Sequence, residues 1–339
     1  VEYADIISGE GRLNKDIYAK ERVKPGVEFK RGQVLYGKLR PYLQNWLLPT
    51  FSGIAVGDFW VLEPKKLDSQ FLYYLIQAPT FSSISNLSVG TKMPRADWKL
   101  ISQASFRVPS FSEEQQKIGR FLSDLDSLIT LHQRKVESVK KLKKSLLQKM
   151  FPKEGETVPA IRFPGFTDAW EQRKLGEYAC KIQRTYEESS APIMMITSEG
   201  GFIEQSRRYS FNNAGKSLKK YILLYKGELA YNHGASKLRP YGSCFSLEHQ
   251  ESARVPYVYH CFSVSGHNAV FFSYLLNLSS IQKELRKLVS SGTRQDGLLN
   301  ISFEQYCSVP IKVPTKEEQQ KIATLFQELE RDITLHQRV

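Results

Sequence analysis

The most regular pattern of apolar and polar positions lies in residues 113–151, which contain no proline and one glycine, Gly119. Its apolar positions recur in alternating steps of four and three residues, a spacing typical of the contact seam of a coiled coil. The spacing of Ser112 and Gln115 predicts a capping box at the start of the helix. At 1.5 Å per residue the helix is about 55–60 Å long, and so narrow an apolar stripe requires a partner helix. The predicted seam consists of Ile118, Leu122, Leu125, Ile129 and His132, followed by Val136 and Val139.

The partner helix is predicted in the same chain, at residues 317–339. EEQQKI occurs at 113–118 and again at 317–322, and ITLHQR occurs at 129–134 and 333–338, so both motifs recur 204 residues apart. This period is far longer than a solenoid repeat, and it indicates two similar halves, each a globular region followed by a long helix. The second seam consists of Ile322, Phe326, Leu329, Ile333 and His336.

The regions before the two helices predict globular domains of mixed α/β character. Residues 27–36 predict two strands around a turn at Arg31 and Gly32, residues 59–62 a buried strand, and residues 71–77 a short helix. The second half repeats these signals in looser form. We therefore expect an α+β protein with an internal pseudo-twofold repeat. Its parts are a domain at 1–111, a helix and linker at 112–155, a domain at 156–314 and a helix at 315–339.

The two halves are not expected to be equally complete. Residues 159–175 open the second domain and have no counterpart before Val1, so the first domain is predicted to lack its opening segment. The second helix stops before a counterpart of residues 136–151. The absence of an initial Met suggests that the chain begins inside a longer protein. The start also lacks the basic and apolar regions of a signal peptide.

Charge and composition narrow the class of protein. The chain of 339 residues has a formal net charge of +13 and is 41% hydrophobic, which suits folded domains with a polyanionic partner, most often nucleic acid. The alternative is simply a basic soluble surface. No apolar run approaches 18 residues, so no membrane span is expected. The four cysteines show no CxxC pairing, which favours a reducing cytoplasm.

No motif of the sequence predicts catalysis or metal binding. Residues 214–217 resemble the end of a P-loop, but Ser210 stands where the first glycine is required. Cys244, His249, His260 and Cys261 lie close in sequence, yet their spacing matches no usual zinc site. Methyl-donor, nuclease and nucleophile signatures are also missing. The sequence therefore favours a binding protein over an enzyme.

Two kinds of loop are candidate DNA contacts. The sequence Lys-Leu-Arg-Pro-Tyr occurs at 38–42 and at 237–241. Its arginine can bind a guanine edge or phosphate, and its proline limits the entropy lost on binding. The loops at 90–95 and 292–294 join glycine amides, a hydroxyl and a cation, which suits phosphate. The alternative for both is a structural turn. The candidate residues are Lys38, Arg40, Tyr42, Thr91, Lys92, Arg95, Lys237, Arg239, Tyr241, Thr293 and Arg294.

The long helix also carries a basic run at residues 134–149, in which seven cations stand against one acid, Glu137. This run is either a solvated helix face, or a surface for DNA or an acidic partner. His132 and His336 occupy matching seam positions, where paired polar residues more often set helix register than bind metal.

At EEQQKI, ITLHQR, LLQKMFP and RFPGFTDAWEQRKLG, the chain resembles the specificity subunit of type I restriction–modification systems. The resemblance implies two target-recognition domains, at 1–111 and 156–314, that each read half of a bipartite double-stranded DNA site. It implies that the two helices pack antiparallel as a spacer and dock two methyltransferase subunits and a restriction subunit. It also implies a non-catalytic chain, with S-adenosylmethionine, ATP and magnesium bound by the partner subunits.

Three hypotheses follow. The first is a DNA reader that acts as a ruler, in which the helix pair fixes the separation of two recognition domains. The second is a coiled-coil scaffold whose basic charge is incidental, which would show no steep dependence of DNA affinity on salt. The third is a nuclease or methyltransferase with an unrecognised site, which would show turnover by the chain alone.

Overall fold

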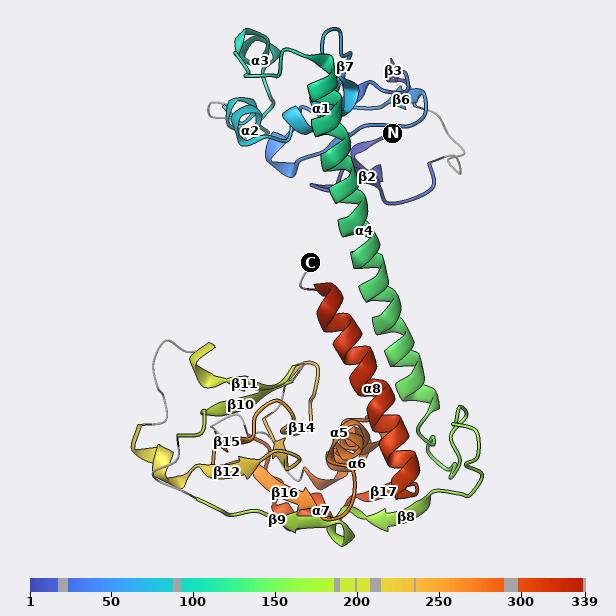
Figure 1. Ribbon diagram of the computed structural model, residues 1–339, viewed down its shortest axis with the longest axis vertical. Coiled ribbons are helices and arrows are strands. Elements are labelled where there is room, and N and C mark those ends of the chain that lie inside the picture. The colour runs from blue at the N-terminus through green and yellow to red at the C-terminus, as the bar shows by residue number, and fades with distance from the viewer. Residues whose placement is uncertain are drawn as a thin grey trace. The chain divides into compact units, whose positions relative to one another are not determined.

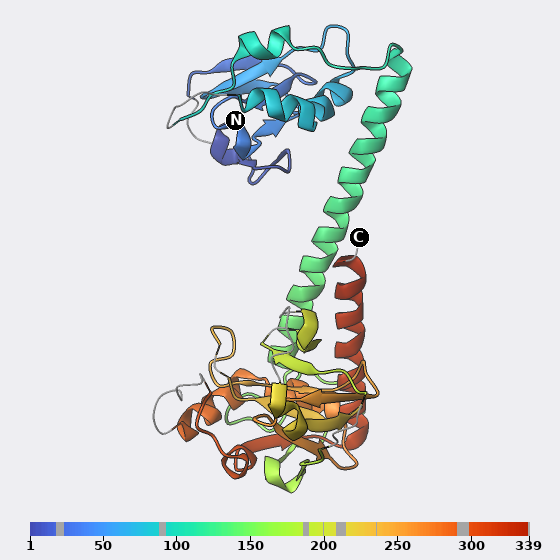
Figure 2. The same ribbon diagram turned by 90° about the vertical axis from the view of Figure 1, so that its left-hand side faces the viewer.

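The structure is a computed structural model, and it describes residues 1–17, 24–87, 93–185, 190–198, 200–207, 215–234, 236–289 and 298–337. The chain forms two compact units, Val1–His132 and Gln133–Val339, whose boundary falls within one helix, α4 (Ser112–Lys149). Each unit mixes antiparallel strands with helices, in agreement with the predicted α+β class (Figures 1 and 2). Within the described ranges, no helix has both the length and the apolar character needed to cross a membrane.

The first unit is built around β4, the middle strand of a three-stranded antiparallel sheet. Tyr36 on β4 pairs with Trp46 on one side and with Trp60 on the other. The two strands predicted around Gly32 are confirmed as β3 and β4, but β3 pairs with β6 in a separate sheet. The strands are β1 (Ile6–Ile7), β2 (Arg12–Leu13), β3 (Val27–Phe29), β4 (Val34–Gly37), β5 (Trp46–Leu47), β6 (Gly53–Ala55) and β7 (Phe59–Leu62). The helices before α4 are η1 (Tyr3–Asp5), η2 (Pro41–Leu43), α1 (Ser69–Leu75), α2 (Pro79–Ser85) and α3 (Trp98–Gln103).

Strand β4 is apolar at every position because both of its faces are covered. Side chains alternate across a strand, so Val34 and Tyr36 face one core and Leu35 faces another. The first core contains the α1 and α2 side chains Tyr73, Ile76 and Phe81 together with Trp46, and the second contains Ile6, Phe29, Leu47, Ala55 and Phe59. The sheet is therefore the central layer of the first unit.

The second unit is built around a four-stranded antiparallel sheet in the order β14-β13-β16-β9. Three two-stranded sheets accompany it, β12 with β15, β10 with β11, and β17 with β8. The strands are β8 (Glu171–Lys174), β9 (Ala179–Lys181), β10 (Met194–Thr197), β11 (Gly201–Glu204), β12 (Ile222–Tyr225), β13 (Leu229–Asn232), β14 (Ser243–Ser246), β15 (Ser252–Val255), β16 (His260–Val264) and β17 (Pro310–Val313). The helices are η3 (Leu175–Glu177), η4 (Gln205–Arg207), η5 (Gly215–Lys220), α5 (Ala269–Leu276), α6 (Ser279–Leu288), α7 (Phe303–Cys307) and α8 (Lys316–Gln337).

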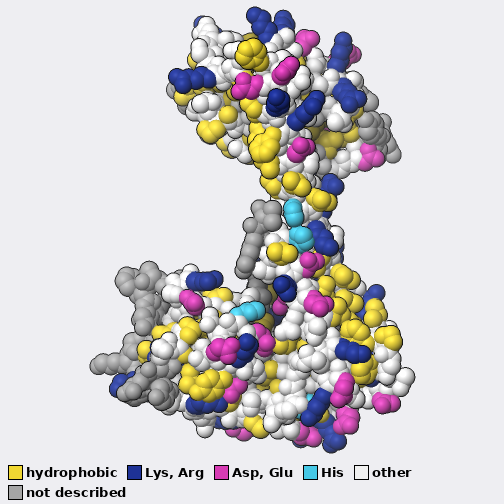
Figure 3. All heavy atoms as spheres, in the orientation of Figure 1, with side chains coloured by type: hydrophobic (Ala, Val, Ile, Leu, Met, Phe, Trp, Pro, Cys, Tyr) yellow, Lys and Arg dark blue, Asp and Glu magenta, His cyan; other side chains and the backbone are white. Residues whose placement is uncertain are grey.

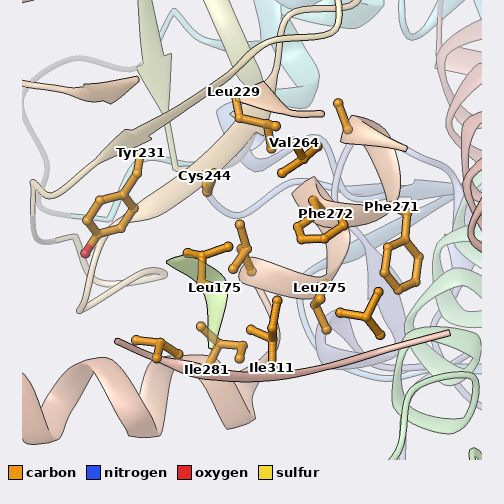
Figure 4. Close-up of a cluster of buried hydrophobic side chains, with 14 of the residues drawn as sticks. Leu175, Leu229, Tyr231, Cys244, Val264, Phe271, Phe272, Leu275, Ile281 and Ile311 are labelled. Atoms are coloured by element: carbon orange, nitrogen blue, oxygen red, sulfur yellow. The ribbon is translucent and has the colours of Figure 1, made fainter. Parts of the chain in front are cut away.

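The main core of the second unit lies between this sheet and α5. Phe271 and Phe272 of α5 are fully buried beside Leu229 and Val264 of the sheet (Figure 4). Tyr231 stacks on Tyr306 of α7 with ring centroids 4.0 Å apart. Leu229 and Tyr231 of this core belong to β13, the strand that precedes the predicted loop at 237–241.

Residues 133–149 of α4 and helix α8 run side by side in opposite directions within the second unit (Figures 1 and 2). Two ion pairs join them, Lys143 with Glu330 at 2.5 Å and Lys135 with Asp332 at 3.7 Å. Two of the seven cations of the basic run therefore pair with acids of α8, and a third, Lys140, pairs with Glu137 of α4 at 3.6 Å.

The seam residues of α8 serve the core as well as the helix pair. Ile322 and Phe326 are buried, and the Phe326 ring lies 4.8 Å from that of Tyr274 on α5 and 6.3 Å from that of Phe151. The stripe at the start of α8 is therefore apolar mainly because it docks on a globular core. Leu329, Ile333 and His336 are half-buried. On α4, Val136 and Val139 are buried, Ile118, Leu122 and His132 are half-buried, and Leu125 and Ile129 are exposed.

The start of α4 is attached to the first unit through a buried glutamine. The Gln115 side chain accepts a hydrogen bond from the backbone N–H of Asp68 at 2.9 Å and donates one to the Pro109 carbonyl at 2.9 Å. The prediction that Gln115 forms a capping box with Ser112 is therefore wrong. The amide is turned away from Ser112 because both of its hydrogen-bonding groups find backbone partners, at Asp68 and at Pro109.

The start of α8 is attached to the second unit in the same way. The Gln319 side chain accepts a hydrogen bond from the backbone N–H of Asn268 at 3.2 Å and donates one to the Pro314 carbonyl at 2.9 Å. Gln319 and Gln115 occupy the same position of the repeated EEQQKI motif. We call each set of three residues a joint: Asp68, Pro109 and Gln115 in the first unit, and Asn268, Pro314 and Gln319 in the second.

Candidate nucleic-acid interface

The two basic loops predicted in the first unit lie next to each other. Leu39 forms an isolated antiparallel bridge with Arg95, and the Arg40 N–H donates to the Pro94 carbonyl at 2.7 Å. Asp58 lies between their cations, 3.8 Å from the Lys38 ammonium and 3.1 Å from the Arg95 guanidinium. The two loops, at 38–42 and 90–95, lie far apart in the sequence, and nothing in the sequence predicted that they would meet. The fold thus gathers three of the predicted cations on one surface.

Arg40 and Tyr42 project from a loop that is held in a strained conformation. Arg40 has φ 50° and Gln44 has φ 54°, a left-handed conformation that costs non-glycine residues about 1–2 kcal/mol each. Hydrogen bonds from Leu43 N–H to Arg40 O and from Gln44 N–H to Pro41 O close the turn. Tyr42 is 57% exposed, and among the described residues the Arg40 side chain has neither an ion pair nor a hydrogen bond. Both are therefore presented to solvent from a fixed backbone.

Tyr3, which was not among the predicted contacts, supports this loop through two hydrogen bonds. Its hydroxyl donates to the Asp58 carbonyl at 2.7 Å and accepts from the Leu39 N–H at 3.1 Å. Burial raises the pKa of Tyr3 to about 12, so the hydroxyl keeps its proton and its donor role. No sequence motif marks this residue, because its role depends on contacts with residues more than thirty positions away.

The identical pentapeptide of the second unit is placed differently. The Arg239 guanidinium donates to the Asn277 carbonyl at 2.5 Å, and burial lowers its pKa. Tyr241 packs against the main core, and its carbonyl accepts from the Tyr231 hydroxyl at 2.6 Å. Lys237 is exposed. Of the three predicted contacts in this loop, the surroundings of Arg239 and Tyr241 favour the structural alternative.

A difference in loop length accounts for this change of role. In the first unit Lys38 follows Tyr36 by two positions, whereas in the second unit Lys237 follows the equivalent Tyr231 by six. The four additional residues include His233, whose backbone carbonyl accepts from the Leu299 N–H at 2.9 Å. The pentapeptide thus follows its strand at a different spacing in the two units.

Four of the predicted contacts, Thr91, Lys92, Thr293 and Arg294, lie outside the described residues. The segments that follow them are described and are attached in the same manner. Arg95 bridges to Leu39 in the first unit, and Leu298 bridges to Gly234 in the second. In the first unit the end of the second basic loop therefore lies beside the first, and in the second unit Leu298 lies beside the segment that precedes the pentapeptide.

Acidic and basic side chains alternate on the visible face of each unit (Figure 3). Several cations form ion pairs, including Arg184, which lies between Glu228 at 2.9 Å and the Tyr225 ring at 4.5 Å. The net positive charge is thus distributed rather than gathered on one visible patch.

The cysteines and histidines considered for zinc do not meet as a metal site. In the described part of the chain, no group of three His, Cys, Asp or Glu side chains could hold a metal ion. Cys244 is buried, which raises the pKa of its thiol to about 12, and His249 is exposed. His260 contacts the Ile301 carbonyl through Nε2 at 2.8 Å. Its ring is half-buried and lies 4.9 Å from that of His233 and 5.8 Å from that of Phe303.

The comparisons with known proteins agree on one family. A family model described as "Type I restriction modification DNA specificity domain" matches residues 47–141 and 168–339. The chain is 28% identical over 128 residues to the type I restriction enzyme EcoDI specificity subunit of Escherichia coli, covering 37% of this chain and 29% of that protein. It is 29% identical over 130 residues to the MjaVIII specificity subunit of Methanocaldococcus jannaschii, covering 37% of this chain and 30% of that protein.

A solved structure shows the same fold. The type I restriction–modification S subunit of M. genitalium aligns with a TM-score of 0.59 at 15% identity, covering 99% of this chain and 83% of that chain. The sequence matches span less than a third of the length of the two curated relatives. The resemblance drawn from the repeated motifs is confirmed: this chain belongs to the family of type I restriction–modification specificity subunits.

Proposed function

We propose that the chain reads two short double-stranded DNA elements at a fixed separation and has no catalytic activity of its own. We call the globular part of each unit, apart from its long helix, a reading head. The observation that carries the DNA-binding part is the loop that presents Arg40 and Tyr42 from a fixed backbone. Arginine can bind guanine bidentately, and an exposed ring can pack on a base or sugar.

The helices act in this proposal as a ruler between the two heads. We propose that they form an antiparallel coiled-coil spacer and dock methyltransferase and restriction subunits. The partner subunits would bind S-adenosylmethionine, ATP and magnesium. The repeated joints support this proposal, because each attaches a head to a long helix through the same two hydrogen bonds.

The binding test is a selection from a randomised duplex pool at two salt concentrations, with and without a methyltransferase subunit. We expect two short motifs at one constant gap. A four-residue insertion in the exposed face of α4, after Leu128, adds roughly 6 Å, so the gap should grow by about one or two base pairs. The same insertion after Gly165, an exposed turn outside both helices, should leave the gap unchanged. An unchanged gap after the helix insertion would rule out the ruler.

The scaffold hypothesis remains the second candidate because of specific contacts. Lys135 and Lys143 pair with acids of α8, and Arg239 is committed to the Asn277 carbonyl, so these cations are occupied within the chain. A scaffold would bind DNA without motif enrichment and without a steep loss of affinity between low and high salt.

A further inference from the structure

We propose that Gln115 and Gln319 are positioning residues, which hold each reading head at one angle on its helix and thereby set the gap between the two DNA elements. The inference rests on the proposed function for its DNA consequence. The joint itself can be tested without DNA. Its basis is that two buried glutamines, at one position of a repeated motif, make the same two contacts in two different heads.

Burial and chemistry make glutamine the fitting residue. Gln115 is 4% exposed and Gln319 is fully buried. An amide offers one acceptor oxygen and two donor hydrogens in a plane, so it can take an N–H and reach a carbonyl at the same time. Glutamate has no donor, lysine has no acceptor, and asparagine is one methylene shorter. Each glutamine thus pairs with one backbone N–H and one backbone carbonyl, as buried polar side chains generally do.

At each joint, the backbone N–H that the glutamine accepts from belongs to the residue that caps a helix of the head. Asp68 is the N-cap of α1 and accepts from the Gln70 and Phe71 N–H groups at 2.9 and 3.0 Å. Asn268 is the N-cap of α5 and accepts from the Phe271 N–H at 2.8 Å. Each glutamine is therefore hydrogen-bonded to the N-cap residue of a head helix. The glutamine is thus one of several contacts between the long helix and the head helix, beside the Tyr74–Asp126 hydrogen bond at 2.8 Å in the first unit and the Phe326–Tyr274 ring contact in the second.

One turn further along, the joint leaves no free space. A Cβ placed on Gly119 would lie 2.8 Å from the Gln70 Cβ and 3.0 Å from the Phe71 nitrogen. The equivalent residue of α8, Ala323, is fully buried. Such close contact one turn after each glutamine restricts rocking of the head, because a densely packed interface has discrete arrangements.

The first experiment measures the gap. The wild-type chain and the variants Gln115→Met, Gln319→Met and Gln116→Met are each taken through the randomised duplex selection. Methionine fills the space of glutamine but makes neither hydrogen bond, and Gln116 is the exposed neighbour, which serves as the matched control. In the first two variants we expect the selected bases to stay the same while the preference for one gap over its neighbours falls by about tenfold, roughly the effect of one or two lost hydrogen bonds.

A further variant, Gln115→Glu, keeps the acceptor for Asp68, so it should retain more of the gap preference than Gln115→Met does. Two results would overturn the inference. If the gap stays sharp in Gln115→Met and Gln319→Met, the inference is wrong. If these variants lose the selected bases together with the gap, the glutamines maintain the fold of the head rather than its angle, and the inference is again wrong.

The second experiment measures the joint without DNA. Spin labels are placed at the exposed positions Ser83 on α2 and Ser127 on α4, with Cys180 and Cys307 replaced by serine. We expect a narrow distance distribution in the full chain, broader after Gln115→Met and unchanged after Gln116→Met. An unchanged width in Gln115→Met overturns the joint whatever the DNA result. A broadened width together with no paired motif in the wild type would sink the proposed function and leave the joint standing.

Discussion

Arg162 and Glu318 form an ion pair with two hydrogen bonds inside the second unit, with Nε to Oε1 at 2.7 Å and Nη2 to Oε2 at 2.8 Å. The Glu318 side chain is 1% exposed and that of Arg162 is 10% exposed. Glu318 lies on the first turn of α8, whereas Arg162 belongs to the segment that opens the second domain. The pair therefore fastens that segment to the long helix, and its hydrogen bonds raise the pKa of the Arg162 guanidinium.

Removing Arg162 should strongly destabilise the second unit, because Glu318 would be left buried without a cation. We expect Arg162→Leu to lower the free energy of unfolding by about 3–5 kcal/mol, measured by chemical denaturation. Arg173→Leu is the control, since Arg173 pairs with Glu171 at 3.3 Å on an exposed strand. A loss no larger than that of the control would mean that the buried pair contributes little.

The two equivalent arginines should respond in opposite ways to replacement by alanine. Arg40→Ala should leave the free energy of unfolding within about 0.5 kcal/mol and weaken DNA binding, with a salt slope smaller by about 1. Arg239→Ala should cost on the order of 1–3 kcal/mol, because it removes the donor to the Asn277 carbonyl. Paired measurements of denaturation and DNA affinity check both. Equal effects of the two changes on DNA affinity would contradict this assignment.

Alanine at Gly119 should destabilise the first unit although alanine is the better helix former. The added methyl must displace α1, which typically costs about 1–3 kcal/mol, against a gain of up to about 1 kcal/mol in helix propensity. We expect a net loss on the order of 1 kcal/mol in thermal unfolding of the first unit. Ser127→Ala, at an exposed position of the same helix, should be neutral or stabilising. A stabilised Gly119→Ala protein would show that α1 and α4 can separate freely.

The stability of the second unit should fall in mild acid because of His260. Burial lowers the pKa of His260 below its ordinary value of 6.5, and His233 and Lys181 act in the same direction, whereas the contact with Ile301 and the charge of Glu304 oppose them. The unfolded chain therefore takes up a proton at a higher pH than the folded chain does. This contribution to the unfolding free energy is fully present above pH 6.5 and is lost as the pH falls through the lowered pKa.

Replacement of His260 tests this pH dependence. His260→Gln should flatten the fall in unfolding free energy below pH 6.5, measured by denaturation over a series of pH values. His249→Gln, at an exposed histidine, should retain the fall. An equal slope in His260→Gln and the wild type would assign the acid sensitivity to other groups.

The helices could be predicted from periodicity and repetition because the helical pattern is carried by residues that lie close together in the sequence. The helix at Ser112 begins where predicted, and the two strands around Gly32 and the helix after Asp68 are present. Local pattern could not reveal what the glutamine of EEQQKI contacts. Its spacing from Ser112 suits a capping box, while its partners Asp68 and Pro109 are set by the packing of α1 on α4.

For the candidate DNA contacts too, the role of a residue depends on residues far away in the sequence as well as on its own motif. The pentapeptides at 38–42 and 237–241 are identical, so no property of the pentapeptide distinguishes Arg40 from Arg239. The distinction arises from the four additional residues before Lys237 and from the carbonyl of Asn277, which a helix far along the chain supplies. Only the length difference after Tyr231 was visible in the sequence, and it could have warned against treating the two loops as equivalent.

The exposed loop around Arg40 also bears on how such a protein can diversify. Arg40 and Tyr42 support no core, so exchanges there should have little effect on folding, whereas Gln115 and Gln319 are buried and each makes two backbone hydrogen bonds, so exchanges there should loosen the joint. Exchanges that the fold tolerates are then concentrated in this exposed loop. Under the proposed function, a lineage could change the DNA bases that it reads by single substitutions there and keep an inherited spacing.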